Sequence, residues 1–258
     1  AFRVFGPTAQ KMKEDGVEGG TLSSGIDCWL KKVEYPIIDK WYAKHASGEG
    51  SYHVDSGEGL DNFHVGISQG CGGIAVKSAT GYRVSKNFTA FKPMANGYLQ
   101  TSFALDYAPW KIDSAHEIYT RKSLSLDRGS NLTRIEVTVD SLDVISAGLT
   151  LHENDGEVTI DSLGGWISYW QPHGDSFLGS AIIASPGTFV GAEKLVSAQA
   201  DLSNVYAHLS VEDHKAVYYS GFFWQKSGQF KGRKEWEEYL VKYAAQLRSP
   251  LTVNVKVD

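Results

Sequence analysis

A glycine-rich stretch carries the residues best suited to acid–base chemistry. Residues 52–73 read "YHVDSGEGLDNFHVGISQGCGG", with two histidines and three acidic residues between glycines. His53 and Asp55 are two positions apart, so in an extended segment their side chains point the same way. A carboxylate that hydrogen-bonds an imidazole selects its tautomer and makes it a good base. The alternative is local: Asp55 and Glu58 cap turns, and His53 forms a nearby hydrogen bond.

A metal ion is the rival use of the same residues. His53, Asp55, Glu58 and His64 could converge on zinc or calcium, and Asp61 offers a further oxygen ligand. The stretch contains no HExxH or EF-hand pattern. We therefore expect no cofactor, and we predict that a bound ion, if found, uses at least one of the two histidines.

The two cysteines, Cys28 and Cys71, lie far apart and without CxxC spacing. This spacing excludes a zinc site built on cysteines. A single disulfide and a pair of partly buried thiols both fit the sequence.

Charge and hydropathy narrow the range of partners that the protein could have. The formal net charge is −5, and lysines and arginines are scattered singly, so nucleic acid is not expected as a partner. The chain has no apolar run near the roughly 20 residues that span a bilayer. It opens on the strand-like "AFRVFGPTAQ", which suggests that an upstream segment, with a secretion signal, precedes it.

The pattern along the chain is that of a β protein. In "LTRIEVTVD", Ile135, Val137 and Val139 alternate with polar residues, as in a half-buried strand. Similar segments separated by turn residues recur from residue 72 to 224, and another covers 251–257. We predict an all-β fold, a large antiparallel β-sandwich over residues 1–258, with more than about a third of the residues in strands.

Few segments have helical spacing. The clearest is predicted within residues 233–247, where Trp236, Leu240 and Tyr243 recur at three to four residues and Pro250 follows. A shorter helix is predicted in "YPIIDKWYAKHA", residues 35–46, with Pro36 near its first turn.

Three stretches together resemble a known family: "SGIDCWLKKVEYPIIDKWY", residues 52–73, and "VYYSGFFWQKSGQFKGRKEWEEYL". The family is a bacterial domain of unknown function from polysaccharide-utilisation loci, and it includes a dehydratase of ulvan oligosaccharides. The resemblance covers nearly the whole chain and implies a sandwich similar to galactose mutarotase. It also implies a periplasmic or extracellular lyase that removes water from the non-reducing-end uronic acid of an anionic oligosaccharide.

Dehydration needs a base, a proton donor and a cation for the substrate carboxylate. With the resemblance in view, we expect His53, oriented by Asp55, to transfer a proton, with Tyr219 or Tyr107 across the cleft. Arg83 or Lys226 would hold the carboxylate, because both offer a cation near aromatic or polar neighbours. The remaining expected sugar-binding residues are Trp170, His173 and Trp224.

Two other function classes fit the same sequence. A non-catalytic carbohydrate-binding module needs aromatic side chains but no acid–base stretch. A mutarotase or epimerase would share the fold and a histidine acid/base. Glycoside hydrolysis also stays open, because no spacing identifies a carboxylate pair.

Overall fold

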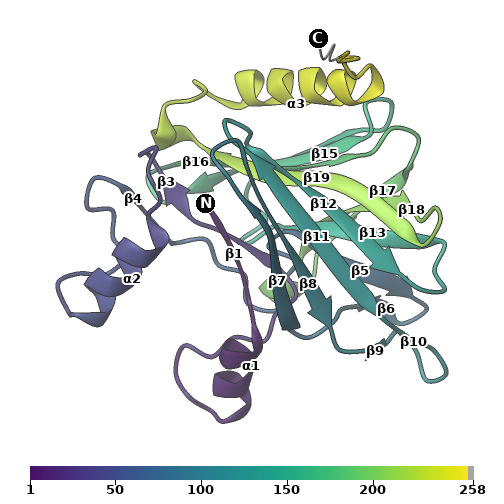
Figure 1. Ribbon diagram of the computed structural model, residues 1–258, viewed down its shortest axis with the longest axis horizontal. Coiled ribbons are helices and arrows are strands. Elements are labelled where there is room, and N and C mark those ends of the chain that lie inside the picture. Colours follow the sequence, from purple (N-terminus) through teal and green to yellow (C-terminus); the bar gives the residue numbers. More distant parts are fainter. Residues whose placement is uncertain (255–258) are drawn as a thin grey trace.

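A computed structural model describes residues 1–254 and shows two large antiparallel sheets stacked face to face (Figure 1). Strands make up 44% of the described residues and helices 15%, which confirms the all-β sandwich. Within the described residues the larger sheet has this strand order: β14 (Glu157–Asp161), β15 (Trp166–His173), β16 (Ser176–Ala184), β19 (Lys215–Trp224), β12 (Leu132–Val139), β11 (Thr120–Asp127), β8 (Gln100–Tyr107) and β7 (Phe88–Asn96). The smaller sheet has the order β17 (Phe189–Leu195), β18 (Asn204–Ser210), β13 (Val144–Thr150), β5 (Cys71–Ser78) and β6 (Gly81–Arg83).

Alternation along the strands builds the core between the sheets. In β12, Ile135, Val137 and Val139 are at most 1% exposed, as their period of two predicts. On the opposite face of the same strand, Arg134 pairs with Glu136 at 2.9 Å. In β12 the alternation therefore places Ile135, Val137 and Val139 in the sandwich interior and Arg134 and Glu136 on the opposite face.

The two sheets approach closely at β5 and β19. The Tyr218 hydroxyl donates to the Gly72 carbonyl oxygen at 2.6 Å, and the Ser220 hydroxyl donates to the Cys71 carbonyl oxygen at 3.1 Å. Gly72 has φ +100°, and a Cβ there would lie 2.4 Å from Ser220 Oγ. Only glycine fits this contact, because it tolerates positive φ and brings no side chain.

The C-terminal helix α3 (Arg233–Arg248) crosses the outer face of the larger sheet (Figure 1). Trp236, Leu240 and Ala244 are buried against this face, and the Trp236 indole N–H donates to Ser168 Oγ at 3.1 Å. The helix predicted within 233–247 is therefore confirmed, and its spacing reflects this buried stripe.

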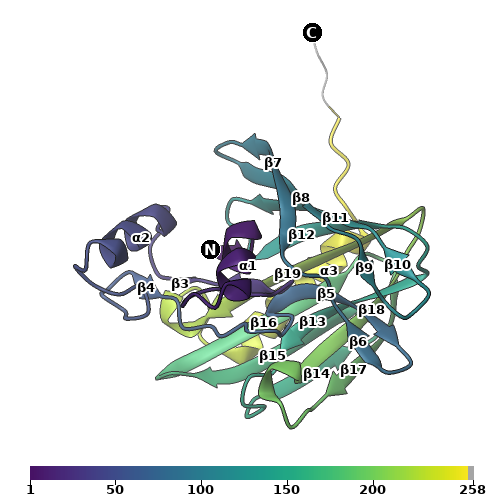
Figure 2. The same cartoon turned by 90° about the horizontal axis from the view of Figure 1, so that it is seen from below.

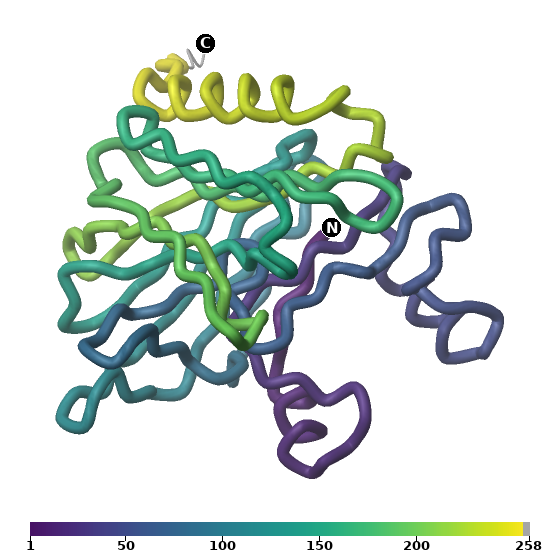
Figure 3. The backbone as a smooth tube through the Cα atoms, turned by 180° about the vertical axis from the view of Figure 1, so that it is seen from behind, coloured from purple at the N-terminus to yellow at the C-terminus, as the bar shows by residue number. Residues whose placement is uncertain are grey.

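The N-terminal quarter of the chain lies on one flank of the sandwich (Figure 3). It contains β1 (Phe2–Val4), α1 (Pro7–Glu14), β2 (Ile26–Cys28), β3 (Leu30–Lys31), α2 (Ile38–Ala46) and β4 (Gly59–Leu60). The view from below shows α1 and α2 as separate projections on this flank (Figure 2). Strand β1 pairs with β2 so that Arg3 lies opposite Asp27.

Helix α2 is confirmed, whereas α1 was not predicted from the strand-like opening. Pro7 takes the first helical position of α1, where its missing N–H costs nothing. The remaining short elements are β9 (Trp110–Lys111), β10 (Glu117–Ile118) and the 3₁₀ turns η1 (Ala200–Leu202) and η2 (Gln225–Ser227).

Some of the strand-like segments of the sequence do not form one continuous strand. The run 82–94 is interrupted between β6 and β7 by Asn87, whose amide accepts from Ser23 N at 2.7 Å and donates to Gly6 O at 3.0 Å and Thr21 O at 2.8 Å. These bonds attach the N-terminal segment to the sandwich. At the other end, residues 251–254 form no strand despite their alternation, and the rest of the strand predicted at 251–257 lies outside the described residues. No helix in residues 1–254 is long and apolar enough to cross a membrane.

Lys122 of β11 is buried in the sandwich without an acidic partner among residues 1–254. It is 1% exposed, and its Nζ lies 3.4 Å from the Ser24 carbonyl oxygen and 4.6 Å from the Tyr107 ring centroid. Burial lowers the pKa of Lys122 to about 7. The native state therefore binds fewer protons than the unfolded state between about pH 7 and the ordinary lysine value.

This proton difference predicts a pH-dependent effect of Lys122→Met. Wild-type stability should rise from pH 7 to pH 10, because the unfolded state holds the extra proton there. Lys122→Met should remove that rise and be more stable at pH 7, by on the order of a few kcal/mol. Denaturant unfolding at several pH values measures this, with the exposed Lys92→Met as control. Parallel pH profiles for wild type and Lys122→Met would contradict the prediction.

Candidate functional site

A pocket of about 620 Å³ lies between the N-terminal segment and the glycine-rich stretch. We call it the Arg3 pocket. Its charged and titratable lining residues are Arg3, Lys13, Asp27, His53, Asp61, His64 and Asp201. They come from β1, α1, β2, the stretch 52–73 and η1, so residues far apart in sequence meet here. The pocket thus joins cations, carboxylates and imidazoles in one hollow.

One guanidinium holds two carboxylates at the pocket wall. Arg3 Nη2 lies 2.6 Å from Asp27 Oδ2 and 3.8 Å from Asp61 Oδ2, and Arg3 Nη1 donates to the Tyr42 hydroxyl at 2.7 Å. Asp27 is 1% exposed and Asp61 4%. Burial, and then the nearby Asp61 carboxylate, raises the pKa of Asp27 to about 7. Burial also raises the pKa of Asp61, against the opposing charges of Arg3 and His53.

His53 is oriented by the backbone and not by Asp55. Its Nδ1 lies 2.5 Å from the Asp61 carbonyl oxygen. A carbonyl oxygen only accepts, so Nδ1 carries the hydrogen, and in the neutral ring Nε2 keeps its lone pair. His53 Nε2 is therefore the open proton acceptor at this side of the Arg3 pocket.

Asp55, expected to orient His53, has a structural role instead. Its Oδ1 accepts from the backbone N–H groups of Gly57 and Gly59 at 2.8 and 3.1 Å, and its Oδ2 pairs with Lys32 at 2.7 Å. Burial opposes ionisation, but Lys32 and the two N–H groups outweigh it and lower the pKa of Asp55. The turn-capping interpretation of this residue is the one that the geometry supports.

The four residues considered for a metal do not converge. Glu58 accepts from Tyr35, Lys40 and the Trp41 indole, and these donors lower its pKa to about 2. His64 pairs with Asp201. Among the described residues no group of three or more His, Cys, Asp or Glu side chains is placed to hold a metal ion.

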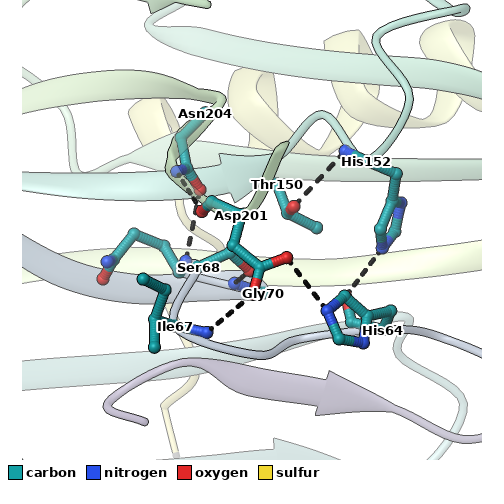
Figure 4. A network of polar contacts seen from close by, with 9 residues as sticks. His64, Ile67, Ser68, Gly70, Thr150, His152, Asp201 and Asn204 are labelled. Carbon is teal, nitrogen blue, oxygen red and sulfur yellow. Dashed lines mark hydrogen bonds and ion pairs between the residues drawn. The ribbon is translucent and has the colours of Figure 1, made fainter. Parts of the chain in front are cut away.

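A histidine–carboxylate pair does exist in the Arg3 pocket, between His64 and Asp201 (Figure 4). His64 Nε2 lies 2.9 Å from Asp201 Oδ1, and the Ile67 backbone N–H donates to Asp201 Oδ2 at 3.2 Å. Gly66 lies between them with φ +51°, and a Cβ there would come 1.9 Å from Asp201 Oδ2. Glycine at this position therefore lets the carboxylate reach both partners.

Two further histidines support this side of the pocket from behind. His152 Nε2 donates to the His64 carbonyl oxygen at 2.8 Å, and His173 Nε2 lies 2.9 Å from Asn62 Oδ1. Burial, followed by the nearby His152, lowers the pKa of His173 to about 4, so its ring is neutral and donates to Asn62. His173, expected to bind sugar, thus orients the pocket-lining Asn62.

The two tyrosines expected across the cleft lie elsewhere. Tyr219 packs beneath α3 against Tyr243, with ring centroids 5.4 Å apart. Tyr107 is 3% exposed in the sandwich core, where burial raises its pKa and its ring faces Lys122. Neither lines the Arg3 pocket. Alternation along a strand does not reveal which face meets a cleft, so the sequence pattern could not place these two side chains.

The expected substrate-binding cations and tryptophans are also engaged elsewhere. Arg83 donates to Thr80 Oγ1 at 2.7 Å in the β5–β6 turn, and Lys226 pairs with Asp175 at 2.5 Å. Trp170 stacks on Phe177 beside α3, with centroids 5.6 Å apart. Trp224 is 4% exposed and lines a separate pocket of about 190 Å³.

Both thiols are free and buried. Cys71 Sγ donates to the Gly221 carbonyl oxygen at 3.2 Å. Burial, together with the neighbouring Cys71 thiol, raises the pKa of Cys28. The structure therefore has two buried free thiols at Cys28 and Cys71 and no disulfide between them.

No sequence pattern pointed to three central residues of the pocket. Arg3 reads as one residue of an apolar strand, Asp27 as part of "GIDCW", and Asp201 as an ordinary loop acid. The alternation "IDCW" offered a clue, because a strand that buries Ile26 and Cys28 places Asp27 on its opposite face. Asp27 meets Arg3 only because β1 pairs with β2.

The chain belongs to the family described as Domain of unknown function (DUF4861), whose model matches residues 1–253. It is similar to the uncharacterized protein P7 of Formosa agariphila, with 51% identity over 257 residues. The match covers 99% of this chain and 65% of that relative's length.

The contact at Gly66 predicts a localised effect of Gly66→Ala. A methyl group there would push Asp201 away from His64 and Ile67, in addition to the ~1 kcal/mol cost of a left-handed non-glycine residue. Gly48→Ala is the matched control, because Gly48 has φ +76° with open space around it. Denaturant unfolding should show Gly66→Ala losing at least ~1 kcal/mol more than Gly48→Ala. Equal losses of stability in the two variants would show that the His64–Asp201 pair does not depend on the missing side chain at Gly66.

Proposed function

We propose that the Arg3 pocket binds the non-reducing-end uronic acid of an anionic, ulvan-type oligosaccharide and removes water across C4 and C5. The observation that carries the proposal is His53. Its Nδ1 is committed to the Asp61 carbonyl oxygen, so its Nε2 is open in a pocket that also presents cations. A uronate needs this combination of a proton acceptor and a positive charge before its C5 hydrogen can leave.

The reaction is a β-elimination. His53 Nε2 takes the C5 proton, the electron pair of that C–H bond forms the C4=C5 double bond, and the 4-hydroxyl leaves as water after receiving a proton. Charge that develops on the substrate carboxylate is stabilised by a cation. The elimination is redox-neutral, so this scheme calls for no electron-carrying cofactor.

Lys13 is the cation best placed for the substrate carboxylate. Arg3 already has Asp27, Asp61 and Tyr42 as partners. Lys13 of α1 lines the same pocket, is exposed, and forms no ion pair in the part of the chain that the structure describes. In the proposal Lys13 contacts the substrate carboxylate directly, and Arg3 contributes to the positive electrostatic potential of the pocket wall.

Membership of the family supports the proposal, because the motifs of this chain resemble a family that includes an ulvan oligosaccharide dehydratase. An enzyme of this kind acts on polysaccharide fragments in the periplasm or outside the cell. The likeness to the galactose-mutarotase sandwich stays a prediction from the same resemblance. An epimerase or mutarotase would also use His53, whereas a binding module would not depend on it.

The product mass separates these functions. Incubation with a uronic-acid-terminated oligosaccharide should give a product that has lost one water and absorbs in the ultraviolet through its new double bond. A hydrolase would add water across a glycosidic bond of the oligosaccharide. An epimerase, a mutarotase or a binding module would leave the mass of the oligosaccharide unchanged. If the wild-type protein leaves the masses of a panel of such oligosaccharides unchanged, the dehydratase proposal is wrong.

His53→Gln tests the proton acceptor within that assay. Glutamine retains an amide N–H for the Asp61 carbonyl oxygen but cannot take up a proton. We expect kcat to fall by about 10²–10⁴-fold, the usual contribution of a general base. His45→Gln is the control, because the His45 ring lies 6.4 Å from that of His53 but outside the pocket lining. Full activity of a folded His53→Gln protein would remove His53 from the mechanism.

Lys13→Met tests substrate binding separately. Loss of a cation that holds the carboxylate should raise KM about tenfold or more. Lys11→Met is the control on the same helix, since Lys11 pairs with Asp15 at 2.7 Å and does not line the pocket. Unchanged kinetics in Lys13→Met would assign the carboxylate to a different partner.

A further inference from the structure

The His64–Asp201 pair presents an exposed imidazole to the Arg3 pocket (Figure 4). His64 Nε2 lies 2.9 Å from Asp201 Oδ1. A carboxylate oxygen only accepts, so Nε2 carries a hydrogen. The second ring nitrogen, Nδ1, has no hydrogen-bond partner among residues 1–254. The His64 side chain is 69% exposed, so a ligand in the pocket can reach its ring.

Contacts with the backbone of both residues hold this pair in place. The Ile67 N–H donates to Asp201 Oδ2 at 3.2 Å, and the Asn204 side-chain amide donates to the Asp201 carbonyl oxygen at 3.4 Å. His152 Nε2 donates to the His64 carbonyl oxygen at 2.8 Å. The imidazole therefore stands at a fixed position on the pocket wall, although most of its surface faces solvent.

The count of charges favours a positively charged ring. Among residues 1–254, no lysine or arginine forms an ion pair with Asp201, and His64 is its ion-pair partner. An opposite charge in contact favours the protonated form of an imidazole. A protonated imidazole carries a hydrogen on each nitrogen. His64 then donates to Asp201 through Nε2 and still has an Nδ1–H for a ligand.

The other titratable groups that line the pocket have different roles. A guanidinium does not release its proton, and the contacts of Arg3 hold the two neighbouring carboxylates as acceptors. In the proposed reaction His53 takes up a proton and Lys13 holds the substrate carboxylate. The step that remains is the delivery of a proton to the 4-hydroxyl, and His64 is the lining group that can perform it.

We propose that His64, held by Asp201, donates its Nδ1 proton to the departing 4-hydroxyl of the uronic acid. This assignment rests on the proposed function and names its proton donor. As the C4–O bond breaks, its electron pair stays on the oxygen. The Nδ1–H bond breaks, a new O–H bond forms, and the oxygen leaves as water. His53 Nε2 holds the proton from C5, and exchange with solvent returns both histidines to their starting states.

The first experiment varies the leaving group. His64→Gln should lower kcat by about 10²–10⁴-fold on a terminal uronic acid with a free 4-hydroxyl, the usual contribution of a general acid. A 4-O-sulfated uronic acid expels sulfate, which leaves without protonation, so His64→Gln should approach the wild-type rate on it. His53→Gln should stay impaired on both substrates, because the C5 proton must still be removed.

A second histidine–aspartate pair on the surface supplies a matched control. His116 Nδ1 lies 2.7 Å from Asp113 Oδ2, and the His116 side chain is 70% exposed. His116 does not line the Arg3 pocket. His116→Gln should therefore keep the wild-type rate on both substrates. Asp201→Asn should lower kcat on the free 4-hydroxyl, because a neutral partner no longer favours the protonated imidazole.

The second experiment supplies the proton donor from solution, so it does not depend on the sulfated substrate. His64→Ala leaves space at an exposed position of the pocket wall. Added imidazole should raise the kcat of His64→Ala on the free 4-hydroxyl in proportion to its concentration. The same concentrations of imidazole should leave the kcat of His116→Ala unchanged.

The outcomes separate the donor role from the proposed function. Full activity of His64→Gln on the free 4-hydroxyl would overturn the donor role while His53 still acts as base. Equal impairment of His64→Gln on both leaving groups, or no rescue of His64→Ala by imidazole, would also overturn it. If the wild-type protein removes no water from any uronide, the proposed function and the donor role are both wrong.

Discussion

The ion pair between Arg3 and Asp27 is the interaction on which the pocket depends. The two residues lie opposite each other on β1 and β2, and their side chains meet at 2.6 Å with Asp27 almost fully buried. Removing one partner from such a pair typically costs ~3–5 kcal/mol, because it leaves an uncompensated buried charge. Arg3 therefore holds β1 beside β2, and its two carboxylate partners, Asp27 and Asp61, line the pocket with it.

The sandwich itself provides the rigid surface against which this segment folds. Asn87 interrupts a strand-like run and hydrogen-bonds the backbone of the N-terminal segment. Gly72 allows the two sheets to approach each other closely. Catalytic groups carried on loops need such support, because small displacements of a base or an acid are costly. Here His53 gains its orientation from the backbone of Asp61, whose side chain also contacts Arg3.

Local sequence patterns predicted much of the fold and a smaller part of the site. Alternation of two identified β12, and helical spacing identified α3, because both report burial of one face. The stretch 52–73 was recognised for its chemistry, yet Asp55 caps a turn, and the partners of His53 and His64 are Asp61 O and Asp201. Asp201 lies 137 residues from His64, so no local pattern could pair them. Arg3 and Asp27 likewise meet only when β1 pairs with β2.

The most direct test of this account is the ring ¹⁵N NMR spectrum of His53, assigned with His53→Gln and recorded at neutral pH with and without a saturated uronic-acid oligosaccharide. The account predicts a neutral ring with its hydrogen on Nδ1 and an Nε2 resonance that moves when the oligosaccharide binds. A ring with its hydrogen on Nε2, or an Nε2 resonance unaffected by an oligosaccharide that binds elsewhere on the protein, would contradict the assignment of the Arg3 pocket as the catalytic site.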